Sequence, residues 1–209
     1  MKKLIWFCLA LFGFSACEIN YDPETRYILT SHVEDIDGNA AAGVTCEIKV
    51  DNSYASETIS SGKTDANGNL TLIFPKAKDD ASYDISYFDL NGTYKPFYIN
   101  NVSNALFTDY TFSVDTPLDR SNDVVPLFLE YVQGVEGNFL QSVALAGNLG
   151  VQPIDFMPQE YDFPYESYAY KNQVITLTYV VIEAATGAPA EYEVQIPIGE
   201  NPVSYSLTY

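Results

Sequence analysis

Aromatic and acidic side chains alternate along residues 156–170, the stretch of the sequence best suited to ligand contact. An aromatic ring can cover the apolar face of a sugar while neighbouring carboxylates and amides hydrogen-bond to its hydroxyl groups. We therefore take five rings as candidate ligand contacts: Tyr161, Phe163, Tyr165, Tyr168 and Tyr170. The prolines in the stretch argue against a central strand and so favour a long loop. The alternative is therefore that these rings anchor such a loop onto a β-sandwich or fill the seam between two domains.

Side chains for acid–base or nucleophilic catalysis give little signal. His32 is the only histidine, so any Ser-His-Asp triad would have to use it, and no nucleophile-elbow motif is present. With 28 Asp and Glu residues, two carboxylates will lie at glycosidase spacing by chance alone. We therefore predict no catalytic residue and no cofactor, and keep a glycoside hydrolase only as a third alternative.

Two oxygen-rich segments, Asp35–Asn39 and Asp65–Asn69, have the composition of calcium loops. Neither places glycine and glutamate as an EF-hand does. Asp-Gly and Asn-Gly supply the positive φ angles that tight hairpins need, so we expect hairpin turns here and predict no metal site. Calcium held between loops is the alternative.

The N-terminus has the three parts of a signal peptide: Lys2-Lys3, an apolar run from Leu4 to Phe14, and small residues before Cys17. The run is shorter than the roughly twenty residues that cross a bilayer. The tetrad Phe14-Ser15-Ala16-Cys17 resembles the lipobox of bacterial lipoproteins. The resemblance implies that residues 1–16 are removed, that Cys17 is acylated, and that residues 17–25 form a lipidated tether. An ordinary secretory signal with an incidental cysteine is the alternative.

The composition excludes some partners. The chain carries 10 Lys and Arg against 28 Asp and Glu, a net charge of −18, which repels phosphate backbones and excludes nucleic acid as a partner. Of the three cysteines, only Cys46 lies outside the N-terminal segment. Its alternating surroundings predict a buried strand position rather than a reactive thiol.

Short alternating apolar and polar runs between glycines and prolines predict an all-β chain. Residues 26–119 read as a seven-stranded, Ig-like sandwich, and residues 120–209 as a second β-rich domain. One larger sandwich is the alternative for the second part. The first seven predicted strands are Tyr27–Glu34, Val44–Val50, Ala55–Thr64, Leu70–Pro75, Tyr83–Leu90, Thr93–Val102 and Leu106–Val114. A C-terminal meander is predicted over Gln173–Glu183, Ala190–Ile198 and Val203–Thr208.

Two stretches of the first part resemble the carboxypeptidase-regulatory-like domain, a transthyretin-like β-sandwich common in surface proteins of Bacteroidota. They are Asp35-x-Asp37-Gly38-Asn39 followed by Gly43-Val44, and Thr64-Asp65-Ala66-Asn67-Gly68-Asn69-Leu70 followed by Pro75. The resemblance implies a module that spaces or presents other domains and has no catalytic residues of its own.

These observations predict a lipid-anchored protein of the outer membrane that faces outward and acts as a non-enzymatic binding or scaffolding accessory. The expected partners are the membrane, through the lipid, and a glycan or a transporter or surface complex. The alternative is an adhesion or pilus-type subunit whose strands complement a neighbour's sheet. Its expected sign is a sandwich that lacks one strand or a terminal strand that projects freely.

Overall fold

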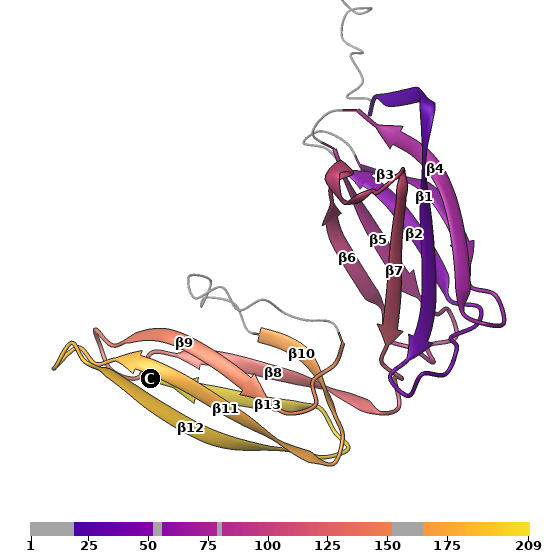
Figure 1. Ribbon diagram of the computed structural model, residues 1–209. Coiled ribbons are helices and arrows are strands. Elements are labelled where there is room, and N and C mark those ends of the chain that lie inside the picture. Colours follow the sequence, from indigo (N-terminus) through magenta and orange to yellow (C-terminus); the bar gives the residue numbers. More distant parts are fainter. Residues whose placement is uncertain (1–18, 52–55, 79–80, 152–164) are drawn as a thin grey trace, which may run out of the picture. The chain divides into compact units, whose positions relative to one another are not determined.

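The computed structural model describes residues 19–51, 56–78, 81–151 and 165–209, and of Tyr165 only the backbone. The chain divides into two compact units. Unit 1 is built from residues 19–33, 40–88 and 98–116, and unit 2 from residues 34–39, 89–97 and 117–209. Both units are β-sandwiches, so the predicted all-β fold, with a seven-stranded N-terminal sandwich followed by a second β-rich part, is confirmed (Figure 1).

Thirteen strands and one short 3-10 helix, η1 (Asn104–Leu106), make up the described fold. The strands up to Leu118 are β1 (Tyr21–Asp35), β2 (Thr45–Asp51), β3 (Ser56–Lys63), β4 (Asn69–Ala77), β5 (Ser82–Phe88), β6 (Phe97–Val102) and β7 (Thr111–Leu118). The strands of the second part are β8 (Val124–Val132), β9 (Phe139–Ala146), β10 (Tyr165–Tyr170), β11 (Gln173–Ile182), β12 (Pro189–Ile198) and β13 (Val203–Thr208).

Three features differ from the sequence prediction. β1 begins at Tyr21, inside the segment predicted as a tether, and β10 occupies the end of the aromatic stretch. The predicted C-terminal meander is wrong. β13 does not pair with β12 but crosses to the other sheet, where it runs parallel to β8 from Val203 opposite Leu127 to Thr208 opposite Val132.

In unit 1 a three-stranded sheet, β4-β1-β7, faces a four-stranded sheet, β3-β2-β5-β6. Alternate residues of β1 and β2 point inward, as the two-residue period of a strand requires. An aromatic cluster fills one part of this core: Tyr27 stacks on Phe107 at 4.0 Å between ring centroids, and both lie edge-on to Phe74 and Tyr83. Two tyrosine hydroxyls of the core are hydrogen-bonded: that of Tyr83 accepts the Ala77 N–H, and that of Tyr87 donates to Ser31.

The two stretches that carry the family resemblance meet in unit 1 through Gly43-Val44 of the first and Thr64 of the second. The buried Thr64 hydroxyl donates to Ala41 O at 2.6 Å and accepts the Val44 N–H at 2.9 Å. Gly68, at φ +77°, brings its carbonyl within 2.8 Å of Val33 N. A Cβ on Gly68 would lie 2.2 Å from Val33 O, so this approach requires glycine.

In unit 2 the sheet β10-β8-β13 faces the sheet β12-β11-β9. Inward side chains of these strands form one buried cluster, whose fully buried members include Leu127, Leu129, Ile175 and Leu177. These six strands make up the second β-rich part of the chain.

The two units share one connectivity. The first strand lies in the centre of a three-stranded sheet beside the last strand: β1 beside β7 in unit 1, and β8 beside β13 in unit 2. Both of these pairs run parallel, as the arrows in Figure 1 show for β1 and β7. The second sheets correspond as well, with β2, β5 and β6 matched by β9, β11 and β12. Only β3 has no counterpart among the described strands of unit 2.

Candidate functional site

The structure describes only part of the predicted site. Cys17, Tyr161 and Phe163 lie outside the described residues. Tyr165 begins β10, and its backbone pairs with Leu129. Tyr168 and Tyr170 lie two residues apart on β10 and so share one face of the sheet.

Tyr170 is held by a buried carboxylate. Its hydroxyl donates to Asp119 Oδ1 at 2.6 Å, and Val151 N donates to Asp119 Oδ2 at 2.9 Å. Asp119 is only 2% exposed. Burial, followed by the hydrogen bond to this carboxylate, raises the pKa of the Tyr170 phenol above its ordinary value. The phenol therefore remains protonated and acts as a donor throughout the physiological range.

Tyr168 is held by a cation. Lys95 Nζ lies 4.6 Å from the centre of its ring, within the range of a cation–π contact. Lys95 N also donates to Asp119 O at 2.9 Å, so the lysine and the buried aspartate belong to one cluster. Gly150 N donates to Tyr168 O at 2.7 Å on the edge of β10. Both described rings thus hold neighbouring loops of unit 2 in place.

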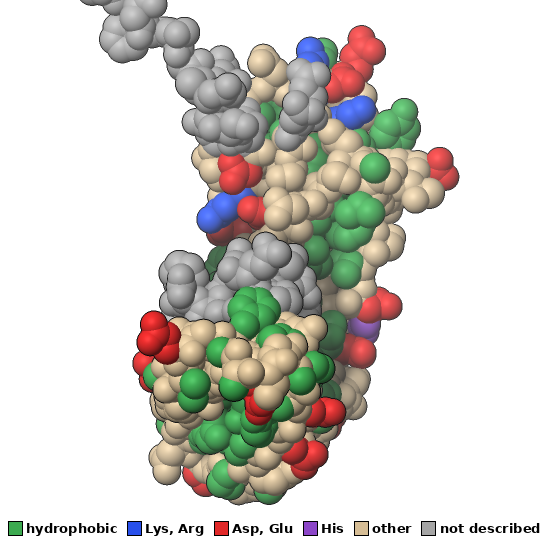
Figure 2. Space-filling view, turned by 90° about the vertical axis from the view of Figure 1, so that its left-hand side faces the viewer, with side chains coloured by type: hydrophobic (Ala, Val, Ile, Leu, Met, Phe, Trp, Pro, Cys, Tyr) green, Lys and Arg blue, Asp and Glu red, His purple; other side chains and the backbone are tan. Residues whose placement is uncertain are grey.

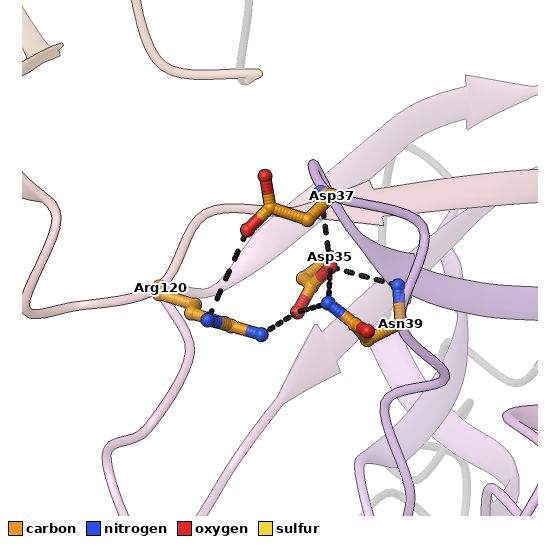
Figure 3. Close-up of polar contacts among 4 residues, drawn as sticks. All are labelled: Asp35, Asp37, Asn39 and Arg120. Atoms are coloured by element: carbon orange, nitrogen blue, oxygen red, sulfur yellow. Dashed lines mark hydrogen bonds and ion pairs between the residues drawn. The ribbon is translucent and has the colours of Figure 1, made fainter.

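A second polar cluster of unit 2 surrounds Asp35 at the end of β1 (Figure 3). Its carboxylate is fully buried and forms an ion pair with Arg120, whose other terminal nitrogen lies 3.9 Å from Asp37 Oδ2. Asp35 Oδ1 also accepts the backbone N–H groups of Asp37 at 3.0 Å and of Asn39 at 2.9 Å. Burial alone would raise the pKa of Asp35, but the hydrogen bonds from Asn39 and Arg120 outweigh it, so the pKa is lowered.

The turn at Asp35 is one of three of the same kind. Asp65 accepts the N–H groups of Asn67 and Asn69, and Asp89 accepts those of Asn91 and Thr93. Each turn then passes through a glycine with positive φ: Gly38, Gly68 and Gly92. The carboxylates at the head of these segments are used to fix turns. The turns after β1 and β3 lead from one sheet to the other instead of joining two paired strands, as the predicted hairpins would.

His32 lies on the outer face of the sheet β4-β1-β7. Its Nδ1 is 3.0 Å from Asn69 Oδ1, and the two residues line a shallow depression of about 270 Å³ with Thr30, Thr71, Ser113 and Asp115. Figure 2 shows the histidine side chain at the surface with acidic side chains on either side. His32 is thus an ordinary strand histidine, and this face offers hydroxyl, amide and carboxylate groups to solvent.

Cys46 is buried in β2 with no exposed surface, so the predicted buried strand position is confirmed. Burial raises the pKa of its thiol to about 12. A thiol with this pKa is a poor nucleophile at neutral pH, because the thiolate is the reactive form.

Within the described parts of the chain, no group of three or more His, Cys, Asp or Glu residues is arranged to hold a metal ion. The same residues include no helix that is long and apolar enough to cross a membrane.

Sequence reasoning missed three members of these clusters: Lys95, Asp119 and Arg120. Arg120 pairs with a residue 85 positions away, and Asp119 bonds to one 51 positions away. No local pattern marks any of these residues. The one available signal was the Asp-x-Asp-Gly-Asn turn. It predicts that Asp35 caps backbone donors but does not predict which residue forms the ion pair with it.

No family model matches the chain, and no curated protein matches it. Several solved structures are similar at low identity. The Bacillus anthracis TIE protein is 13% identical with a TM-score of 0.29, and the match covers 88% of this chain and 34% of that one, so the chain spans about a third of its length. The shaft pilin SpaA from Lactobacillus rhamnosus GG is 12% identical over 88% of this chain and 96% of its own, with a TM-score of 0.30.

A streptococcal ancillary pilin is 11% identical, with a TM-score of 0.31 and coverage of 87% of this chain and 64% of the pilin. At these TM-scores the similarity carries no argument about function.

Proposed function

We propose that this protein is a non-enzymatic spacer of the cell envelope, held to a membrane by a lipid on Cys17, that carries tension along its two sandwich units. The observation that supports this most is the pairing of the terminal strands. In each unit the first and last strands are parallel neighbours, so the chain enters at one end of the sandwich and leaves at the other.

Parallel terminal strands also respond to tension in a particular way. When the two ends of a unit are pulled apart, β8 and β13 slide along each other, and the ladder from Val203 to Thr208 is loaded as a whole. Inter-strand hydrogen bonds lie across the strands, so sliding must strain all of them before any breaks free. This geometry slows forced unfolding, which is the rate that matters under load.

The polar clusters of unit 2 support a structural role rather than a chemical one. Tyr170, Asp119 and Arg120 are each engaged by neighbours within the unit. The turn carboxylates of Asp35, Asp65 and Asp89 are occupied by backbone donors. Groups used in this way stabilise the sandwich and position no reacting atoms.

Membrane attachment is tested by metabolic labelling. Cells that express the full chain are given a palmitate analogue, beside cells that express Cys17→Ala and, as a matched control, Cys46→Ala. We expect the label on the parent and on the Cys46→Ala chain and none on the Cys17→Ala chain. Equal labelling of all three would refute the anchor.

The tension-bearing role is tested separately by pulling the chain from Glu18 to Tyr209 in a single-molecule force experiment. Two unfolding events are expected, one for each unit. Both should occur at forces well above those that open a β-hairpin one hydrogen bond at a time. Unfolding at hairpin-like forces would refute the spacer role while leaving the anchor standing.

A further inference from the structure

The fold of unit 1 begins very close to the proposed lipid on Cys17. Ile19, two residues further on, is buried with 6% of its surface exposed. Lys78 N donates to Asn20 O at 2.8 Å, so the chain is fixed to unit 1 even before β1 begins. Two residues span at most about 7 Å. A membrane that holds the lipid must therefore lie next to this end of unit 1.

The loop between β6 and β7 lies at the same end, where β6 ends, β7 begins and β1 begins (Figure 1). Among the described residues of unit 1, four large apolar side chains are exposed, and two of them belong to this loop: Leu106 at 53% and Tyr110 at 59%. Residues 96–108 carry no charge, and Asp109 is the only charged residue of the loop. The end of unit 1 nearest the anchor thus presents an apolar loop.

The backbone holds Tyr110 in an uncommon conformation. Asp109 and Tyr110 both have positive φ, at 48° and 63°, which is rare for a bulky side chain. Two hydrogen bonds between the backbones of Thr108 and Thr111 close the turn, at 3.0 and 2.8 Å, and Ile28 N donates to Tyr110 O at 2.9 Å. Strained residues of this kind cluster at sites of ligand contact.

A lipid surface is the partner that this loop fits. Tyrosine and leucine suit the boundary between headgroups and acyl chains, because their apolar carbons enter it while the tyrosine hydroxyl stays in the polar layer. The chain as a whole has a net charge of −18 and is repelled by anionic lipids, whereas the loop carries a single charge. The loop is therefore the part of unit 1 that can approach the headgroups most closely.

We propose that the loop between β6 and β7 contacts the membrane that holds the lipid on Cys17, with Leu106 and Tyr110 in the headgroup layer. The proposal rests on the proposed anchor, whereas the spacer role does not require the contact. Two apolar side chains bind a membrane weakly by themselves, but the anchor keeps them at a high effective concentration beside it.

The position of the loop sets the orientation that unit 1 must take. Tyr110 O accepts the Ile28 N–H, and Ile28 lies opposite Ile73 on β4. Ile73 is four residues before Ala77, which pairs with the first residue of β1, so the loop lies about 13 Å along the strands from the point where the chain enters. The headgroup layer is only about 5–7 Å thick on each side of a bilayer. Unit 1 therefore has to tilt toward its β7 edge.

This tilt makes Ile73 a matched control for Tyr110. The two residues lie at one level along the strands, and their exposed fractions are similar, at 62% and 59%. Ile73 belongs to β4, one edge of the sheet β4-β1-β7, whereas Tyr110 directly precedes β7, the opposite edge. A membrane on the β7 side reaches Tyr110 and leaves Ile73 in water.

Tryptophan fluorescence tests the contact. Trp6 is the only tryptophan, so a chain that begins at Cys17 carries a single reporter after Tyr110→Trp or Ile73→Trp. Cys17 is coupled to a maleimide lipid in phosphatidylcholine vesicles, while the buried Cys46 stays unreacted. Half of the samples contain phosphatidylcholine brominated on the upper part of its acyl chains, which quenches nearby tryptophan. Circular dichroism confirms that each variant is folded.

We expect the brominated lipid to quench the Tyr110→Trp chain at least about twofold more strongly than the Ile73→Trp chain. Adding Leu106→Asp to the Tyr110→Trp chain should remove the difference. Equal quenching of the two reporters would overturn the proposal. A blue-shifted Tyr110→Trp emission without quenching would also overturn it, because protein rather than lipid would then cover the loop. Since the lipid is attached chemically, neither result depends on whether cells acylate Cys17, which the palmitate labelling tests.

Discussion

At the scale of single residues, the polar groups buried in this protein are used to hold turns and loops. Asp35 shows how much of this was predictable. Its turn follows from the Asp-x-Asp-Gly-Asn sequence, because an aspartate at that position caps the N–H groups that follow it. Its pairing with Arg120 was not predictable, since it depends on two segments that meet only in the folded unit.

Replacing Asp35 with asparagine should destabilise unit 2 at neutral pH by about 1–3 kcal/mol, because a charged acceptor is lost from a buried site. The lowered pKa of Asp35 means that its stabilising effect is fully present above the unfolded value near 4 and is lost as the pH falls through the folded value. Thermal unfolding of both chains between about pH 7 and pH 3 should therefore show the difference shrinking as the pH falls.

Asp37→Asn is the matched control, since Asp37 is 67% exposed and lies 3.9 Å from the same arginine. An exposed pair of this kind contributes roughly 0–1 kcal/mol. A difference between the parent and Asp35→Asn that does not change with pH would contradict this account of the ion pair.

The raised pKa and complete burial of Cys46 predict that the folded protein resists thiol reagents. On the chain from Glu18 to Tyr209, a maleimide at pH 7 should label Cys46 quickly in guanidinium chloride and very slowly in native buffer. Mass spectrometry measures the labelled fraction. Equally fast labelling in both conditions would show that the interior of β2 is open to solvent.

At the scale of elements, the two-residue pattern of β2 and β5 predicted both strands closely, because each presents alternate residues to the core. β10 was missed because neighbouring prolines argued against a strand, although Tyr165–Tyr170 pairs along its length with β8. The predicted position of β13 beside β12 was wrong for a different reason. A short turn normally returns a strand antiparallel to its neighbour, and only the packing of two sheets shows that it crosses over.

The turn between β3 and β4 provides a test of local backbone strain. Gly68→Ala should destabilise unit 1 by more than Gly92→Ala destabilises unit 2. Both positions have φ near +75°, but of the two only Gly68 would place a Cβ against another backbone atom, Val33 O. Strain alone costs about 1–2 kcal/mol at such a position. Denaturant unfolding compares the two variants. Equal losses of stability would show that the close approach at Gly68 is readily relaxed.

At the scale of the whole molecule, one strand scheme occurs twice, and in both units the terminal strands lie parallel and adjacent. Most of the strands followed from the sequence pattern, but this pairing of first with last did not, because strand order in a sheet depends on contacts far apart in the chain. The proposed tension-bearing role rests on this pairing. The force needed to unfold each unit should therefore depend on the direction in which it is pulled.

The most direct measurement therefore loads the same ladder in two directions. Handles at Glu18 and Tyr209 make β8 and β13 slide along each other, whereas handles at Asn122 and Asn201 pull apart the ends at which both strands begin. Sliding strains the hydrogen bonds together and opening strains them one at a time. At equal loading rates we predict that unit 2 unfolds at a several-fold higher force in the first geometry. Equal forces in the two geometries would contradict the account.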